Sequence, residues 1–328
     1  MASTPVDRIA GAAREIHDNI ARVIVGKADV VELALVAILC EGHILIEDVP
    51  GIGKTMLARS IARSLGCSFN RIQCTPDLLP SDVTGSYVYN QKTNDFEFRS
   101  GPVFAQVLLA DEINRATPRT QSAFLEAMEE RQITVEGETR PLLRPFLVLA
   151  TQNPVELEGT FPLPEAQLDR FLLRVRMGYP DEAEDELIME RFAQGNPISD
   201  LAPVVTAEQL LELQRACREV LVDAEIRQYI IKLVHATRRH PQVELGASPR
   251  AMLGMLHTAQ ALAAIRGRGF VIPDDVKRLA PCVLEHRIIP HSQSHLRGHT
   301  AADILCEVLD SVPVPVEEEE AADASAGV

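Results

Sequence analysis

Residues 47–55 read EDVPGIGKT, and this stretch decides the fold of the first half of the chain. It differs by one residue from the phosphate-loop pattern, which is a glycine, four free positions and then Gly-Lys-Ser/Thr. Gly53, Lys54 and Thr55 complete the end of the pattern, but Asp48 stands where the first glycine is expected. The alternative interpretation is a glycine-rich turn between a strand and a helix, with no ligand.

The segments on both sides favour a true phosphate loop. HILIE (43–47) is typical of a short buried strand, and TMLARSIARSLG (55–66) has the apolar spacing of a helix. Successive N–H groups at such a helix start bind phosphates, and Gly51 and Gly53 allow the close approach. Residue 48 only has to turn the chain off the strand, which an Asp tolerates well. We therefore expect its carboxylate to point away from a triphosphate.

Length, charge and cysteine usage narrow the class of protein. The 328 residues suffice for two domains, and the formal net charge of −15 disfavours a general nucleic-acid or anionic-membrane binder, which needs a basic face. No secretory signal and no apolar run of membrane-spanning length is visible. The six cysteines form no C-x-x-C pair. We expect a cytoplasmic protein with reduced thiols and no membrane span.

The periodicity of apolar residues changes near residue 180. Before it, short apolar strands alternate with helical patterns, which indicates an α/β fold with a mostly parallel sheet between helices. Stretches 85–101 and 131–142 alternate with period two and predict β-hairpins. We predict an α/β domain over 1–180, an all-helical domain over 181–312 and a disordered acidic tail over 313–328. Strands are expected at 44–47, 69–73, 106–110, 146–151 and 171–175.

A second motif is the acid pair in QVLLADEINRA (106–116). Asp111 and Glu112 follow a buried strand, at the sheet edge where ligands of α/β proteins bind. Asp111 can hold a Mg²⁺ ion that Thr55 also ligates, and Glu112 can polarise a water for attack on a γ-phosphate. The alternative is an acid pair that caps a helix.

Three further polar residues follow in a recognisable order. Asn153 ends the strand pattern FLVLATQN, where its amide can orient a water; the alternative is an Asn-Pro turn, which is common. Arg170 lies in LDRF and Arg250 in SPRA. A lone arginine is usually a solvated surface residue, so these two gain weight only from the order of the whole set.

That order resembles the AAA+ ATPases, and more closely the MoxR family within them. The runs that carry the resemblance are EDVPGIGKT, RIQCTPDLLPSDVTG, DEINRA, QSAFLEAMEERQITVEG, ATQNPVELEGTFPLPEAQLDRF and ASPRA. It extends from about residue 20 to about residue 310 and implies an α/β phosphate-loop core with two hairpin inserts, followed by a helical lid. An acid at position 48 is frequent in the family, so Asp48 fits a working site.

The resemblance implies ATP and Mg²⁺ as cofactors and a role for each motif residue. The residues matched to catalysis are Lys54, Glu112, Asn153 and Arg170. The residues matched to Mg²⁺ are Thr55 and Asp111. The residues matched to nucleotide binding are Val25, Gly26, Pro50, Gly51, Ile52, Gly53, Lys54, Thr55, Met56 and Arg250.

The resemblance also implies an assembly. Arg170 matches an arginine finger, which acts on the nucleotide of a neighbouring subunit, so a homo-oligomeric ring, a hexamer, is expected. Arg115 is the rival for this role. The implied function is chaperone-like remodelling or maturation of protein clients, including metal or cofactor insertion, with a partner that carries a von Willebrand A domain.

Two other functions stay open. One is a nucleotide-gated scaffold with little turnover, against which an intact Glu112 and Arg170 argue. The other is a nucleic-acid-dependent motor, which the net charge disfavours. A metal site at His291, His295 and His299 is not expected, because Pro290 and Gly298 interrupt a continuous helix.

Overall fold

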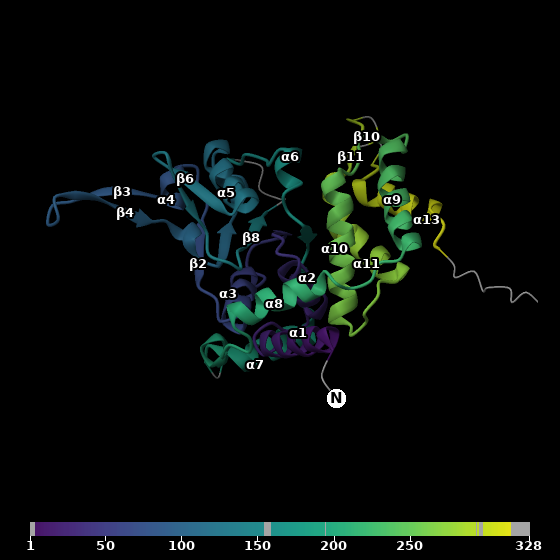
Figure 1. Cartoon of the computed structure of the whole chain (residues 1–328), viewed down its shortest axis with the longest axis horizontal. Coiled ribbons are helices and arrows are strands. Elements are labelled where there is room, and N and C mark those ends of the chain that lie inside the picture. Colours follow the sequence, from purple (N-terminus) through teal and green to yellow (C-terminus); the bar gives the residue numbers. More distant parts are fainter. Residues whose placement is uncertain (1–3, 154–158, 194, 293, 295–297, 316–328) are drawn as a thin grey trace, which may run out of the picture.

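The computed structural model describes residues 4–153, 159–193, 195–292, 294 and 298–315. Figure 1 shows a sheet with its covering helices on one side and a group of helices on the other. Within the described residues, no helix is long and apolar enough to cross a membrane. All six cysteines are free thiols, in agreement with the prediction.

A five-stranded parallel sheet forms the centre of the first half, in the order β2-β5-β8-β1-β9. The strands are β1 (Ile44–Glu47), β2 (Phe69–Gln73), β5 (Val107–Asp111), β8 (Leu147–Gln152) and β9 (Leu173–Val175). The predicted strands are thus confirmed to within two residues. The last one begins later than predicted because Phe171 belongs to a turn, in which its N–H donates to the Leu168 carbonyl.

Helices cover both faces of this sheet. Along β5, Val107 and Leu109 join one apolar core, while Leu108 and Ala110 join a second core on the opposite face. Side chains alternate along a strand, so continuous apolar strands indicate a sheet buried on both sides. The helices of this half are α1 (Pro5–Ala21), α2 (Ala28–Leu39), α3 (Lys54–Ser64), α4 (Pro80–Thr84), α5 (Pro118–Glu130) and α6 (Glu165–Leu168). Short 3-10 turns are η1 (Pro102–Phe104) and η2 (Ile113–Arg115).

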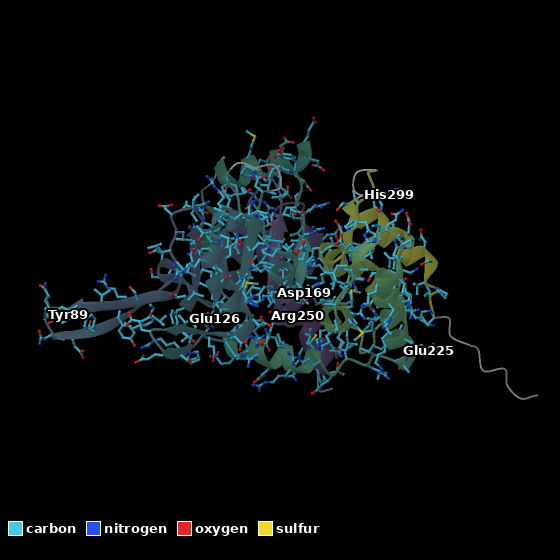
Figure 2. All side chains as sticks on the ribbon, turned by 90° about the horizontal axis from the view of Figure 1, so that it is seen from above. Tyr89, Glu126, Asp169, Glu225, Arg250 and His299 are labelled. Carbon is cyan, nitrogen blue, oxygen red and sulfur yellow. The ribbon has the colours of Figure 1, made fainter. Side chains whose placement is uncertain are left out.

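Both predicted hairpins are present: β3 (Gly85–Asn90) with β4 (Asp95–Ser100), and β6 (Gln132–Val135) with β7 (Glu138–Pro141). The first projects far from the sheet, with Tyr89 near its outer end (Figures 1 and 2). At its base, the Tyr87 hydroxyl donates to Glu138 at 2.5 Å, and the Arg140 guanidinium lies 4.1 Å from the Phe98 ring centroid. These contacts join the two hairpins.

Among the described residues, the second half is helical, as predicted, with one exception in the form of paired strands. Its helices are α7 (Glu182–Ala193), α8 (Ala207–Cys217), α9 (Ala224–Arg239), α10 (Pro249–Ile265), α11 (Pro273–Leu284) and α13 (Ala301–Ser311), with the turns η3 (Pro197–Asp200) and η4 (Glu285–Arg287). The exception is an antiparallel pair of β10 (Val243–Leu245) with β11 (Ile289–Pro290). Segments of three and two residues are too short to show a period. Residues 316–328, most of the predicted tail, lie outside the described residues.

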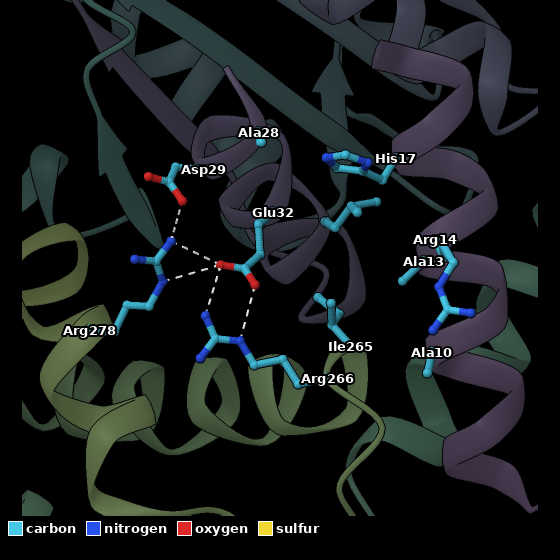
Figure 3. Close-up of a pocket in the computed structure, with 11 residues that line it drawn as sticks. Ala10, Ala13, Arg14, His17, Ala28, Asp29, Glu32, Ile265, Arg266 and Arg278 are labelled. Atoms are coloured by element: carbon cyan, nitrogen blue, oxygen red, sulfur yellow. Dashed lines mark hydrogen bonds and ion pairs between the residues drawn. The ribbon is translucent and has the colours of Figure 1, made fainter. Parts of the chain in front are cut away.

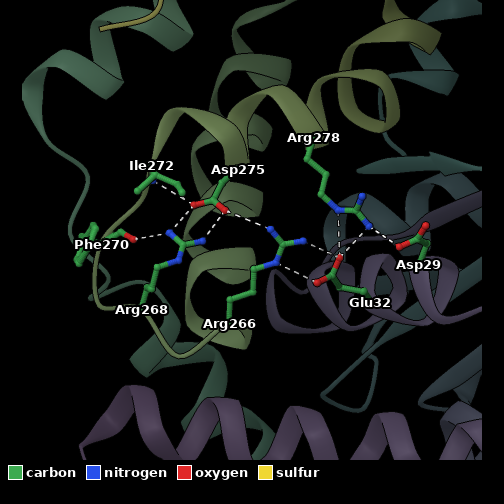
Figure 4. A network of polar contacts seen from close by, with 8 residues as sticks. All are labelled: Asp29, Glu32, Arg266, Arg268, Phe270, Ile272, Asp275 and Arg278. Carbon is green, nitrogen blue, oxygen red and sulfur yellow. Dashed lines mark hydrogen bonds and ion pairs between the residues drawn. The ribbon is translucent and has the colours of Figure 1, made fainter. Parts of the chain in front are cut away.

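Ion pairs join the end of α10 and helix α11 to α2, as Figure 4 shows. Glu32 on α2 accepts hydrogen bonds from Arg266 at 3.2 Å and from Arg278 at 3.0 Å. Nearby, the buried Asp275 pairs with Arg268 at 2.6 Å. Since α2 leads directly into β1, this network fixes the helical half relative to β1 and to the glycine loop that follows it.

Candidate functional site

The glycine loop, the acid pair and Asn153 meet in one cleft at the carboxyl edge of the sheet. Strands β1, β5 and β8 are parallel neighbours, so the residues that follow them come together at that edge. The cleft has a volume of about 250 Å³. It is lined by Pro50, Gly51, Gly53, Lys54, Thr55, Arg71, Gln73, Asp111, Glu112 and Asn153.

The glycine loop has the backbone shape that phosphate binding needs. Gly51 has a φ of 88° and Gly53 a φ of 92°, which only glycine adopts at little cost. Gly53 is also the N-cap of α3, so the free N–H groups of the first helical turn face the cleft. A helix N-terminus with a flexible glycine loop favours an anionic group at this position.

The side chain of Lys54 is hydrogen-bonded to the backbone of the same loop. Its ammonium group donates to the backbone carbonyls of Asp48 at 2.8 Å and Val49 at 3.0 Å. Burial lowers the pKa of Lys54, and the carboxylates of Asp111, Asp48 and Glu112 counteract that shift. A buried cation among carboxylates is a ready partner for the charge of a phosphate.

Asp111 ends β5 and is nearly buried. Its Oδ1 accepts from the Thr151 hydroxyl at 2.6 Å, and its Oδ2 accepts from the Arg71 guanidinium at 2.7 Å. The Asp111 carboxylate and the Thr55 hydroxyl line the same cleft, and such oxygen ligands suit Mg²⁺. The residues present therefore fit the ion that the resemblance implies.

Glu112 is held beside it in a sparsely populated backbone conformation. Its φ is 57°, which is uncommon for a residue other than glycine and is frequent at functional positions. Its Oε2 accepts from Gln73 at 2.9 Å and from Arg115 at 3.3 Å. These two donors give the carboxylate a defined orientation in the cleft.

Sequence reasoning missed Arg71 and Gln73. Both lie on β2 in the run FNRIQ, and their side chains reach Asp111 and Glu112. The available signal was the alternation in this strand, with polar residues on either side of the buried Ile72. Which strand neighbours β2 is a tertiary fact, and only the order β2-β5 brings these residues to the cleft.

Asn153 completes the cleft from the end of β8. It is buried, with 7% of its surface exposed, and it lines the cleft together with Glu112. This placement is the one needed to orient a water beside a carboxylate. The following residues, 154–158, belong to the run that carries the resemblance and lie outside the described residues.

A larger, more apolar pocket adjoins the cleft across the glycine loop. Its volume is about 540 Å³, a size that suits a nucleobase and sugar. Its lining includes Val25, Pro50, Gly51, Ile52, Gly53 and Met56, all assigned to nucleotide binding from the resemblance. Further lining residues are Val23, Ile24, Lys27, Met177, Tyr179, Pro180, Asp185, Ile188 and Phe192. Gly26 adjoins the pocket between Val25 and Lys27.

Arg170 and Arg250 lie together at a different place. Glu129 at the end of α5 pairs with Arg170 at 2.8 Å and with Arg250 at 2.5 Å. Both arginines line a separate cavity of about 240 Å³ at the junction of the two halves, where Figure 2 labels Asp169 and Arg250. Neither arginine is among the described residues that line the phosphate cleft or the apolar pocket.

Residues of the helical half hold Asp169, which directly precedes Arg170 in the chain. The buried Arg287 donates to the Asp169 carboxylate at 2.6 Å and to the Phe171 carbonyl at 2.6 Å. The Ser248 hydroxyl at the start of α10 donates to the same Asp169 at 3.0 Å. The position of Arg170, the next residue, therefore depends on how the helical half is docked.

Two other features do not make sites. The pocket of Figure 3, about 470 Å³ between α1, α2, α10 and α11, has lining charges of both signs, and its Arg266 and Arg278 are already paired with Glu32. In the described part of the chain, no cluster of three or more His, Cys, Asp or Glu side chains has a geometry that suits a metal ion. His295 lies outside that part.

Comparisons with known proteins agree with this geometry. The family model for the ATPase family associated with various cellular activities (AAA) matches residues 43–173, and a model for the AAA lid domain matches residues 235–308. The chaperone MoxR1 of Mycobacterium tuberculosis is 41% identical over 93% of this chain and 84% of its own length. The chain belongs to the MoxR family of AAA+ ATPases.

Other similar proteins match this chain over nearly their whole length. Protein MoxR of Methylorubrum extorquens is 30% identical over 93% of this chain and 95% of its own. The protein YeaC of Bacillus subtilis is 51% identical over 92% and 94%. The crystal structure of a candidate ATPase from Cytophaga hutchinsonii superposes with a TM-score of 0.89 at 38% identity, over 95% of this chain and 97% of the other. The chain therefore has the AAA fold with its helical lid over nearly its whole length.

Proposed function

We propose that this MoxR-type protein binds and hydrolyses ATP with Mg²⁺ in the cleft at the end of the parallel sheet. The observation that carries the proposal is the convergence of Lys54, Asp111 and Glu112 on one cleft beside an apolar pocket of nucleobase size. An unused glycine-rich turn would not need an acid pair and a buried amide at the same edge. We also propose that the α/β domain ends near residue 180 and the lid spans 181–312.

Each residue of the cleft has a chemical task in this proposal. The glycine-loop N–H groups and Lys54 bind the phosphates. Thr55 and Asp111 would hold Mg²⁺, which when bound neutralises charge on the phosphate oxygens. Glu112 accepts the proton of the attacking water, which Asn153 orients.

The arginine cluster supports a site shared between subunits. Arg170 and Arg250 line a cavity other than the phosphate cleft of their own chain. A neighbouring subunit that docks its cleft against this face would receive both guanidinium groups, which fits a closed ring of six copies. Arg115 lies 3.3 Å from its own Glu112, so it is placed for a role in cis and Arg170 is favoured as the trans residue.

The work done by the ring is proposed to be chaperone-like remodelling or maturation of protein clients in the cytoplasm. A relative named as a chaperone supports this, as does the projecting hairpin β3–β4, on which Tyr89 and Phe96 are exposed. Metal or cofactor insertion and a von Willebrand A domain partner remain specific forms of the same proposal. A scaffold with little turnover is the alternative that a rate measurement excludes.

ATP turnover by the purified protein with Mg²⁺, measured as phosphate release, tests the proposal. Lys54→Ala is expected to abolish ATP binding, whereas Glu112→Gln is expected to keep it and to lose about 10² to 10⁴ in turnover, the usual contribution of a general base. Glu126→Gln on the exposed face of α5 is the matched control. Wild-type turnover by Glu112→Gln would remove Glu112 from the mechanism. Wild-type protein that binds ATP but does not turn it over would support the scaffold.

A further inference from the structure

Asp48, the residue that departs from the phosphate-loop pattern, directs its carboxylate to a segment far along the chain. Its Oδ2 accepts from the backbone N–H groups of Met177 at 2.7 Å and Gly178 at 2.6 Å. Its Oδ1 accepts from the N–H of Val49 at 2.8 Å. The carboxylate is thus turned away from the glycine loop, and three backbone donors compensate its charge.

The segment that Asp48 holds is one wall of the apolar pocket. Residues Met177, Tyr179 and Pro180 line that pocket opposite the glycine loop, which supplies residues 50–53. Farther along the segment, the Lys27 ammonium donates to the Tyr179 carbonyl at 3.0 Å. Asp48 is therefore the direct connection between the loop that binds phosphate and the wall that faces the base.

A glycine at position 48 would satisfy the turn but would supply no acceptor for the two N–H groups. The segment follows the end of β9, so strand pairing does not hold it there. An acid at the first position of the phosphate-loop pattern also places negative charge near a triphosphate. That charge does not help phosphate binding, which points to another task for the carboxylate. Hydrogen bonds to an ionised carboxylate are the stronger kind and can hold such a segment.

We propose that Asp48 is a positioning residue for the nucleoside part of the ligand. Its carboxylate fixes residues 177–180 as the wall of the base pocket and takes no part in binding the phosphates. This inference rests on the proposed ATP site and adds to it a division of labour: residues 51–55 bind the phosphates, and Asp48 acts through the backbone of Met177 and Gly178 on the base.

The test compares two ligands by calorimetry in the presence of Mg²⁺: ATP, and inorganic tripolyphosphate, which lacks the nucleoside. Asp48→Gly is expected to weaken ATP binding about tenfold, because two charge-assisted hydrogen bonds are lost and water replaces them only in part. Tripolyphosphate binding is expected to stay within about twofold, which also shows that the loop is folded. Asp48→Asn keeps an acceptor oxygen, so its ATP affinity is expected to fall less than that of Asp48→Gly.

Glu47→Gln is the matched control. It removes a carboxylate from the neighbouring residue, but Glu47 pairs with the side chains of Arg174 at 3.5 Å and Arg176 at 3.2 Å and does not bind the two N–H groups. Its ATP affinity is expected to stay near wild type. In turnover assays, Asp48→Gly is expected to raise KM about tenfold while kcat stays within about twofold, which a general loss of structure would not produce.

Each other result overturns the inference. Tighter binding of both ligands would mean that Asp48 repels phosphates, and unchanged binding of both would reduce it to a turn residue. An equal loss of affinity for both ligands, or the same loss of ATP affinity in Glu47→Gln, would assign the effect to the loop as a whole. Failure of the wild-type protein to bind ATP is a different outcome, since it removes the proposed function itself.

Discussion

Arg170 lies 2.8 Å from Glu129 of its own subunit, so its guanidinium is held by an ion pair before any neighbour is present. The same carboxylate pairs with Arg250 from the lid. Both arginines are partly exposed, so the pairs are weak enough to exchange for a stronger anion. A phosphate of a neighbouring subunit would be such an anion, because guanidinium and phosphate pair bidentately.

Glu129→Gln should therefore release Arg170 and Arg250. An exposed ion pair stabilises its partners by about 0.2–1 kcal/mol, and this free energy no longer has to be overcome when the arginines are released. ATP turnover at saturating ATP should therefore rise by at most about fivefold. The measurement is kcat at high protein concentration, which favours the proposed ring. Glu130→Gln, at the exposed neighbouring position, is the control. A fall in kcat would instead mean that Glu129 positions the arginines for catalysis.

The buried His43 should make the α/β domain sensitive to acid. Its Nδ1 accepts from the Val148 N–H at 3.0 Å, so its Nε2–H donates to the Met128 carbonyl at 3.1 Å. Both bonds suit the neutral ring, and burial lowers the pKa of His43 to about 4. The folded pKa is below the unfolded value, so this stability is complete above pH 6.5 and is lost as the pH falls toward 4.

The size of the effect is about 3 kcal/mol in the free energy of unfolding, as an order of magnitude. Urea unfolding at pH 7 and pH 4.5 measures it. His43→Gln should be the less stable protein at pH 7 but should lose less stability between the two pH values. Equal losses in both proteins would show that His43 does not carry this acid sensitivity. Other titrating groups, including the buried His286, are common to both proteins and cancel in the comparison.

The sequence was sufficient for what local patterns determine. Periodicity predicted the sheet strands and both hairpins. The place of Asp111 after a strand predicted that it lies at the ligand-binding edge of the sheet near Thr55, and both residues line the cleft. The direction of the Asp48 carboxylate, away from the loop, is also confirmed by the structure. The catalytic and binding roles of these residues remain predictions.

The remaining features depend on tertiary neighbours. Arg71 reaches Asp111 only because β2 pairs with β5, and strand order is not encoded in a local window. The partners of Asp48 lie about 130 residues away along the chain. The clustering of Arg250 with Arg170 likewise depends on where the lid docks, to which the contact between Arg287 and Asp169 contributes.

The shared site is the central claim, and mixing two inactive proteins tests it most directly. Arg170→Ala should bind ATP nearly normally yet lose most turnover, since a trans arginine contributes about 10³ to 10⁵ in related phosphoryl transfers. The exposed Arg119→Ala is the control. When Arg170→Ala is mixed in equal amounts with Glu112→Gln, activity should return at about a quarter of the interfaces, where an intact Glu112 meets an intact Arg170 of the neighbouring subunit. No recovery, with mixed rings detected by native mass spectrometry, would contradict the shared site and move the role to Arg115 or to another arginine in cis.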